Sequence, residues 1–261
     1  MKAMQAVILC GGKGTRLREE TEYIPKPLVR IGDKPILWHI LKIYANFGIN
    51  DFVLCLGYKG ELIREYFYHY DLNNADVVLE LGSKKLTKLE RSHGEEGWKL
   101  WLVDSGQETF TGGRLRRVAG HIQGDTFMLT YGDGVADIDL NMLLDFHRRH
   151  GKLATVTAVR PSSRFGELAL DGERILTFKE KPQVNEGWIN GGFFVFEKAV
   201  FDLISGDGDS LEADVLERLA NDDQLAVFRH EGFWQCMDTY REMELLTQIW
   251  DNGAAPWATI K

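Results

Sequence analysis

Short apolar runs alternate along the first half of the chain with longer segments whose apolar positions recur at three- and four-residue intervals. The runs predict strands and the longer segments predict amphipathic helices. We expect strands at residues 5–10, 52–57, 76–81, 99–104 and 127–131. We expect helices at residues 36–47, 61–70, 112–122 and 139–150. This alternation predicts an α/β fold, a Rossmann-like, mostly parallel mixed sheet flanked by helices.

The second half of the chain is richer in strands. The pattern predicts strands at 153–160, 166–170, 174–179 and 189–196, and helices at 197–204, 210–220 and 239–250. The chain contains no internal repeat, low-complexity tract or Pro/Ser-rich linker. We therefore expect the 261 residues to form one domain with a less regular C-terminal portion.

A glycine-rich loop follows the first predicted strand. Residues 11–16 read Gly-Gly-Lys-Gly-Thr-Arg, and a Pro-Lys-Pro sequence centred on Lys26 comes next. Glycines let backbone N–H groups approach a polyphosphate closely, and Arg16 and Lys26 supply positive charge. The spacing excludes a P-loop, and a dinucleotide fingerprint would need glycine where Leu17 stands. A turn without a ligand is the simpler alternative.

Composition limits the classes of partner and the compartment. A formal net charge of −8 argues against nucleic acid as the main partner, so an acidic protein that binds polyphosphate must gather its cations locally, with help from a divalent metal. Apolar runs stay below the roughly 18 residues of a membrane span, and the N-terminus lacks a signal-peptide pattern. The three scattered cysteines are typical of reduced thiols, so we expect a cytoplasmic protein.

Two aspartates are candidate metal ligands. Asp133 lies between two glycines directly after a predicted strand, and Asp238 lies before the last helix. Open parallel sheets bind ligands at the carboxyl ends of their strands, where Asp133 and the glycine loop are both expected. Mg²⁺ takes one or two carboxylates together with phosphate oxygens. The alternatives are a turn aspartate at 133 and a helix N-cap at 238.

Three further segments carry polar side chains of uncertain role. Glu180-Lys181-Pro182 follows a predicted strand and is also typical of a surface turn. Asn190 precedes two glycines, a pattern that suits either contact with sugar hydroxyls or a β-bulge. Arg114 lies in a basic helix start, which is either a solvated face or a ligand contact.

Taken in order along the chain, these motifs resemble the sugar-1-phosphate nucleotidylyltransferase family, and within it the glucose-1-phosphate cytidylyltransferase branch. The resemblance spans the whole chain and rests on the glycine loop, the Pro-Lys-Pro sequence, the Gly-Asp and Glu-Lys-Pro motifs and the late aspartate. Strings typical of the branch are at residues 36–40, 57–60, 111–115, 131–137 and 189–194. Cys10 replaces a common alanine with another small residue.

The resemblance implies that CTP and α-D-glucose 1-phosphate condense to CDP-glucose and pyrophosphate, with Mg²⁺ as cofactor. It implies a nucleotide-diphospho-sugar transferase fold with a nucleotide-binding half at about 1–137 and a strand-rich, sugar-phosphate-binding half at about 138–261. It also implies a homo-oligomer, hexameric or tetrameric, and a role in CDP-linked deoxysugar and lipopolysaccharide or O-antigen biosynthesis.

Site residues follow from the same resemblance. The nucleotide-binding set is Leu9, Cys10, Gly11, Gly12, Lys13, Gly14, Thr15, Arg16, Lys26, Thr109, Gly113, Arg114 and Gly132. The sugar-phosphate set is Glu180, Lys181 and Asn190. The metal pair is Asp133 with Asp238, and the groups expected to act in catalysis are Arg16, Lys26, Asp133 and Lys181.

The choice of base is a separate hypothesis. Cytosine presents acceptors at O2 and N3, whereas uracil carries N–H at N3. Because a guanidinium has only donors, we expect Arg114 to favour cytosine, with assistance from Thr109. Two alternatives stay open. One is the same reaction with UTP, dTTP or another hexose 1-phosphate, and the other is a non-catalytic nucleotide-sugar-binding module.

Overall fold

A seven-stranded mixed sheet forms the centre of the computed structural model, which describes residues 4–12, 14, 17–88, 94–95, 97–161, 167–171, 174–179 and 187–258. Its strands are β1 (Gln5–Leu9), β4 (Asp51–Leu56), β7 (Lys99–Asp104), β8 (Thr126–Tyr131), β10 (Ala154–Val159), β13 (Ile189–Glu197) and β14 (Leu225–His230). Their order is β14-β10-β13-β8-β1-β4-β7. Only β13 pairs antiparallel with its neighbours in this sheet, so the expected mostly parallel mixed sheet is confirmed.

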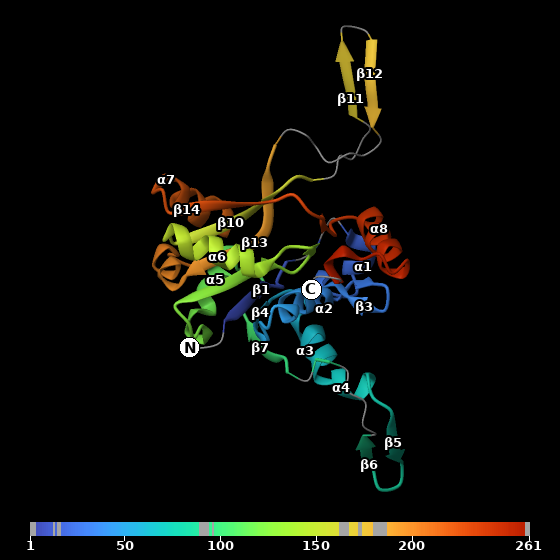
Figure 1. Cartoon of the computed structure of the whole chain (residues 1–261). Coiled ribbons are helices and arrows are strands. Elements are labelled where there is room, and N and C mark those ends of the chain that lie inside the picture. Colours follow the sequence, from blue (N-terminus) through green and yellow to red (C-terminus); the bar gives the residue numbers. More distant parts are fainter. Residues whose placement is uncertain are drawn as a thin grey trace.

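Helices cover both faces of the sheet (Figure 1). Those contributing side chains to one apolar cluster are α2 (Ile36–Asn46), α3 (Gly60–Tyr68), α6 (Leu140–His150), α8 (Tyr240–Asp251) and η6 (Pro256–Ala258). Those contributing to the cluster on the other face are α5 (Thr111–Arg117), η4 (Lys198–Leu203), η5 (Leu211–Leu216) and α7 (Glu217–Asn221). None of the helices in the described part of the chain is long and apolar enough to cross a membrane.

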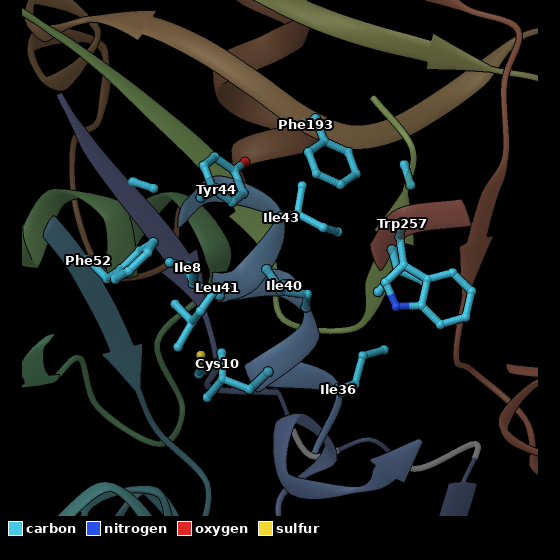
Figure 2. Close-up of a cluster of buried hydrophobic side chains, with 14 of the residues drawn as sticks. Ile8, Cys10, Ile36, Ile40, Leu41, Ile43, Tyr44, Phe52, Phe193 and Trp257 are labelled. Atoms are coloured by element: carbon cyan, nitrogen blue, oxygen red, sulfur yellow. The ribbon is translucent and has the colours of Figure 1, made fainter. Parts of the chain in front are cut away.

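The alternation of side chains along β1 shows why the sheet lies between two apolar layers. Ala6 and Ile8 point into one cluster, and Val7 and Leu9 point into the other. Figure 2 shows the first cluster, to which β1 contributes Ile8 and α2 contributes Ile40 and Leu41. Because both faces are buried, the central strands carry nearly continuous apolar runs, and these runs made them recognisable in the sequence.

Short elements connect this frame. They are α1 (Arg18–Thr21), η2 (Lys26–Leu28), β2 (Arg30–Ile31), β3 (Lys34–Pro35), α4 (Tyr70–Asn73), η3 (Ala119–His121), β9 (Gly134–Ala136) and β15 (Trp234–Cys236). Two hairpins, β5–β6 (Val77–Glu80, Lys85–Lys88) and β11–β12 (Glu167–Asp171, Arg174–Lys179), extend away from the sheet in Figure 1.

Three predicted helices differ from the structure in type or length. The helix expected at 112–122 ends at Arg117 and continues as the 3₁₀ turn η3. Residues 198–203 form the 3₁₀ helix η4, and the helix expected at 210–220 begins as the π-helix η5 before continuing as α7. Apolar spacing does not separate these closely related helices, since all three place similar positions on one face.

Candidate active site at the carboxyl ends of the strands

The glycine loop lies against the Gly-Asp motif, as expected. The N–H of Gly132 donates to the carbonyl of Leu9 at 3.1 Å, because β1 and β8 are parallel neighbours and end at the same edge. Gly14 has a φ of +60°, which glycine adopts without strain. Lys13, Thr15 and Arg16 lie outside the described residues.

Gly11 lies so close to the side chain of Arg114 that a larger residue would not fit there, whether or not a ligand is bound. A Cβ at Gly11 would lie 1.9 Å from Nη1 of Arg114, and one at Gly57 would lie 2.3 Å from the same atom. A Cβ at Gly12, in contrast, would contact nothing within 4 Å. Close approach by the guanidinium therefore accounts for Gly11, while Gly12 leaves backbone open to the cavity beside it.

Two cavities meet at this edge of the sheet. The smaller cavity has a volume of about 470 Å³ and the larger one about 1150 Å³. Members of the expected nucleotide set that line the smaller cavity are Leu9, Cys10, Gly11, Gly12, Gly14, Lys26, Thr109, Arg114 and Gly132. Asp133 and Tyr131 line both cavities. Gly113 does not line either cavity, since it packs against the backbone of Asp207.

Lys26 joins the two predicted metal ligands. Its Nζ lies 2.7 Å from Oδ2 of Asp133 and 2.5 Å from Oδ1 of Asp238. Burial alone lowers the pKa of Lys26, but attraction to Asp133 and the hydrogen bonds to both carboxylates outweigh it, so the pKa is raised. Residues 26, 133 and 238 are far apart in the sequence, and the fold gathers them around one positive charge.

Asp238 is not the N-cap of the last helix. The cap of α8 is Thr239, which forms a capping box with Glu242. The Glu242 carboxylate also accepts a 2.8 Å hydrogen bond from the N–H of Asp238. This cap holds the backbone beside Asp238, whose carboxylate lies with Asp133 in the wall of the larger cavity.

These carboxylates fit a magnesium ion. Two carboxylates share one cation in the structure, and Mg²⁺ binds through one or two carboxylates with the remaining positions filled by phosphate oxygens and water. Among the described residues, His, Cys, Asp and Glu form no group of three or more suited to a metal. Two carboxylates would leave the remaining positions of such an ion to phosphate oxygens and water.

Asn190 lines the larger cavity beside a bulge in β13. Its Oδ1 accepts a 2.8 Å hydrogen bond from the N–H of Gly192, and its Nδ2 donates to the hydroxyl of Tyr131 at 3.2 Å. The register of β10 and β13 shifts between Val156 and Ala158, opposite these glycines. The β-bulge is therefore confirmed, and Asn190 lies beside it in the cavity wall. Contact of Asn190 with sugar hydroxyls stays a prediction. Glu180 and Lys181 lie outside the described residues.

Arg114 is buried, with 5% of its surface exposed. Its Nη1 donates to the carbonyl of Gly106 at 2.6 Å and to the hydroxyl of Ser105 at 3.0 Å, and Nη2 donates to the carbonyl of Gln107 at 3.0 Å. The guanidinium thus holds the loop that leads to Thr109, and within the described part of the chain Nε and one Nη2 hydrogen form no further hydrogen bond. Base recognition by Arg114 stays a prediction.

Sequence reasoning did not identify Tyr131 or Glu212. Tyr131 stands directly before the Gly-Asp motif, and that position was its one signal. Glu212 lines the smaller cavity from η5. It lies in a segment rich in acidic residues, where nothing in the pattern separates it from its neighbours.

A mixed α/β sheet with a glycine loop, a lysine and two carboxylates at its carboxyl edge defines a nucleotide-binding transferase class. Residues 5–242 match the family model described as "Nucleotidyl transferase", and the chain belongs to this family. It is 49% identical over 258 residues to a glucose-1-phosphate cytidylyltransferase of Salmonella typhi, covering 98% of this chain and 99% of that protein. It is 45% identical over 255 residues to a probable glucose-1-phosphate cytidylyltransferase of Bacillus subtilis, covering 97% and 99%.

The solved structures agree with this fold. The crystal structure of HddC from Yersinia pseudotuberculosis is similar with a TM-score of 0.70 at 20% identity, covering 95% of this chain and 99% of that chain. At this identity the likeness concerns the fold alone. The expected family and fold are both confirmed, and the chain is a nucleotidyltransferase.

Proposed function

We propose that this enzyme transfers a cytidylyl group from CTP to α-D-glucose 1-phosphate, giving CDP-glucose and pyrophosphate. The full-length relatives at 45–49% identity carry the name of this activity. The observation that carries the proposal is the position of Asp133, which lines both cavities and binds Lys26. A reaction that joins two phosphates needs a charged group where their cavities meet.

The reaction is a single in-line displacement. A phosphate oxygen of glucose 1-phosphate attacks the α-phosphorus of CTP, a new P–O bond forms, and the bond to the β-phosphate oxygen breaks as pyrophosphate leaves. Bringing two polyanions together is the main obstacle, so catalysis depends on position and charge. We assign the loop N–H groups and Arg16 to the leaving pyrophosphate, and Lys26 and Lys181 to the reacting phosphates.

We propose that Asp133 and Asp238 hold a Mg²⁺ ion. When bound, it would neutralise charge on the α-phosphate and help to orient it. In the structure, the ammonium group of Lys26 neutralises the charge of the same two carboxylates. Glu180 and Asn190 are assigned to the sugar.

We propose that Arg114 and Thr109 select the base. They would donate to it the side-chain hydrogens that form no hydrogen bond among the residues that the structure describes. The bound carbonyls of Gly106 and Gln107 fix the guanidinium in place, so it cannot turn away from a mismatched base. A fixed donor facing the N3–H of uracil would leave two donors opposed, which disfavours UTP.

A pyrophosphate-release assay tests this function. The purified protein is given each of CTP, UTP, dTTP, ATP and GTP with glucose 1-phosphate, and then CTP with mannose 1-phosphate or galactose 1-phosphate, with and without Mg²⁺. We expect release with CTP, glucose 1-phosphate and Mg²⁺. Release with a different pair would favour that substrate pair, and no release with any pair would favour the non-catalytic binding module.

We further propose a homo-oligomer. Paired residues of an antiparallel hairpin share a face, so Val77, Leu79 and Leu86 form one face of β5–β6, with exposed fractions of 37%, 53% and 50%. A two-stranded hairpin is marginally stable unless its apolar face is covered. A second copy of this chain is the partner we assign to it.

A cytoplasmic location and a role in CDP-linked surface-polysaccharide synthesis complete the proposal. The three cysteines are free thiols, two of them buried, which is typical of a reducing compartment. CDP-glucose is a substrate for enzymes that modify or transfer the activated sugar.

A further inference from the structure

Tyr131 separates the two cavities, and its hydroxyl is held from both sides. The hydroxyl lies 2.5 Å from Oε1 of Glu212, which lines the smaller cavity. It lies 3.2 Å from Nδ2 of Asn190, which lines the larger cavity. A chain of hydrogen bonds therefore runs from one cavity to the other through a single phenol.

The Glu212 carboxylate determines which group donates and which accepts in each of these hydrogen bonds. An ionised carboxylate only accepts hydrogen bonds, so the Tyr131 hydroxyl must donate to Glu212. The phenol oxygen is then free to accept, and Nδ2 of Asn190 donates to it. The N–H of Gly192 donates to Oδ1 of Asn190, which fixes the other end of the amide. The amide consequently presents one N–H and one oxygen lone pair for a ligand, as a sugar hydroxyl requires.

Glu212 is held ionised and in place by hydroxyl groups. Besides Tyr131, the hydroxyls of Thr111 and Ser210 donate to its Oε2 at 2.7 and 2.8 Å. Burial raises the pKa of Glu212, but these hydrogen bonds outweigh it, so the pKa is lowered. Three hydroxyls use most of the acceptor capacity of the carboxylate, which leaves little for a nucleotide.

The local backbone is built around this contact. Glu212 lies in the first turn of the π-helix η5, a rare conformation that is frequent at functional sites. Gly192 has a φ of +80°, and a Cβ there would lie 2.6 Å from the ring of Tyr131. The ring also packs edge-to-face on Phe194 with centroids 5.8 Å apart. The phenol is therefore fixed in the wall between the cavities.

We propose that Glu212 and Tyr131 are a positioning pair that sets the orientation of the Asn190 amide in the larger cavity, and so binding of the sugar phosphate. The proposal rests on the assignment of the larger cavity to glucose 1-phosphate. Glu212 would thus line the cavity assigned to the nucleotide and yet act on binding of the other substrate.

Kinetics of Glu212→Gln and Tyr131→Phe test this pair. We expect the KM for glucose 1-phosphate to rise about tenfold or more in both variants, the scale of one lost hydrogen bond to a charged group. The KM for CTP should stay within about threefold, because neither change removes a nucleotide contact. Because the two residues act as one unit, the double variant should resemble the single variants.

Thr126→Val is the matched control. The Thr126 hydroxyl donates to the Glu197 carboxylate at 2.9 Å, at the other end of the strand that carries Tyr131. This variant also loses a hydroxyl–carboxylate bond, but away from both cavities, so both KM values should be unchanged. Melting temperatures measured in parallel show that each variant is folded.

Several results would overturn the inference. An unchanged KM for glucose 1-phosphate in folded Tyr131→Phe and Glu212→Gln would do so, as would a rise confined to the KM for CTP. If one variant fails to fold, the other carries the test. Failure of the proposed function is a separate result, in which the wild-type protein releases no pyrophosphate from CTP and glucose 1-phosphate.

Discussion

The positive charge of Lys26 keeps two carboxylates together in the absence of a ligand. At 2.7 and 2.5 Å its contacts with Asp133 and Asp238 are those of charge-assisted hydrogen bonds. In the proposed function, the same two carboxylates bind Mg²⁺ together with phosphate oxygens. Under this proposal Lys26 would then be available to a phosphate oxygen.

Asp133→Asn should lower kcat by about 100-fold or more, the effect of losing one preorganised electrostatic contact. Steady-state pyrophosphate release measures it. The matched control is Asp139→Asn, which removes the same charge from the N-cap of α6, where asparagine caps equally well. Asp139→Asn should keep wild-type turnover. Similar turnover in folded Asp133→Asn would remove Asp133 from the metal site.

Arg114→Ala should reduce the preference for CTP over UTP by about tenfold or more, since one bidentate or charged donor is lost. The ratio of kcat/KM for the two nucleotides is the readout. A control is Arg116→Ala, on the same helix, which removes an exposed guanidinium bound to the carbonyl of Ser205. An unchanged CTP preference in Arg114→Ala would refute its role in base selection.

At the site, the sequence predicted which residues meet but not how they are held. The glycine loop and Asp133 were recognisable because each directly follows a predicted strand, whereas Lys26 and Asp238 were assigned through the family resemblance. The hydrogen bonds of Arg114 to residues 105–107 and the Tyr131–Glu212 contact depend on tertiary packing between segments far apart in the chain. Local pattern does not encode such contacts.

At the scale of elements, strands in the sheet interior were predicted within one or two residues. Residues 127–131 were expected for β8 (Thr126–Tyr131), and residues 189–196 were expected for β13 (Ile189–Glu197). Strands that were not predicted are β6 (Lys85–Lys88), the edge strand β14 (Leu225–His230) and the short strands β2, β3, β9 and β15. The short strands β2, β3, β9 and β15 span only two or three residues, which is too few for a periodic pattern. Strand β6 has a single apolar residue, Leu86, and the apolar start of β14 is followed at once by Arg229 and His230.

Helix α2 carries a buried histidine that should make stability pH-dependent. His39 Nε2 lies 3.0 Å from the carbonyl of Ile31, and Nδ1 accepts from the indole N–H of Trp257 at 3.3 Å. These partners suit the neutral imidazole, and burial lowers its pKa from 6.5 to about 4. The unfolded chain therefore binds more protons than the native state between these values.

The stabilisation from His39 is complete above pH 6.5 and is lost as the pH falls toward 4. Between pH 7 and pH 5 we expect a loss of about 2 kcal/mol in the free energy of unfolding. Urea unfolding at both pH values measures it, with His39→Gln as the comparison. The loss should be about 2 kcal/mol smaller in His39→Gln, and an equal loss in both proteins would contradict the assignment.

For the whole molecule, the proposed oligomer is tested on hairpin β5–β6. Leu79→Asp places a charge on its apolar face and should dissociate the assembly, as measured by light scattering after size-exclusion chromatography. Thr87→Asp adds the same charge to the opposite face and should leave the mass unchanged. A monomeric wild-type protein, or an intact Leu79→Asp oligomer, would show that this face has another role.

Residues from both predicted halves of the chain line each of the two cavities. The smaller cavity draws Ser210 and Glu212 from the second half, and the larger cavity draws Tyr131 and Asp133 from the first. The strands of each half form a contiguous block of one sheet, and the two blocks meet where β13 pairs with β8. Substrate cavities that share walls in this way suit a reaction between two bound phosphates.

A one-pot competition tests the central claim most directly. The enzyme is incubated with Mg²⁺, glucose 1-phosphate and equal concentrations of CTP, UTP and dTTP, and the nucleotide sugars are identified by mass spectrometry. We predict CDP-glucose as the dominant product, formed together with pyrophosphate. UDP-glucose or dTDP-glucose as the main product would contradict the assignment of this site to CTP.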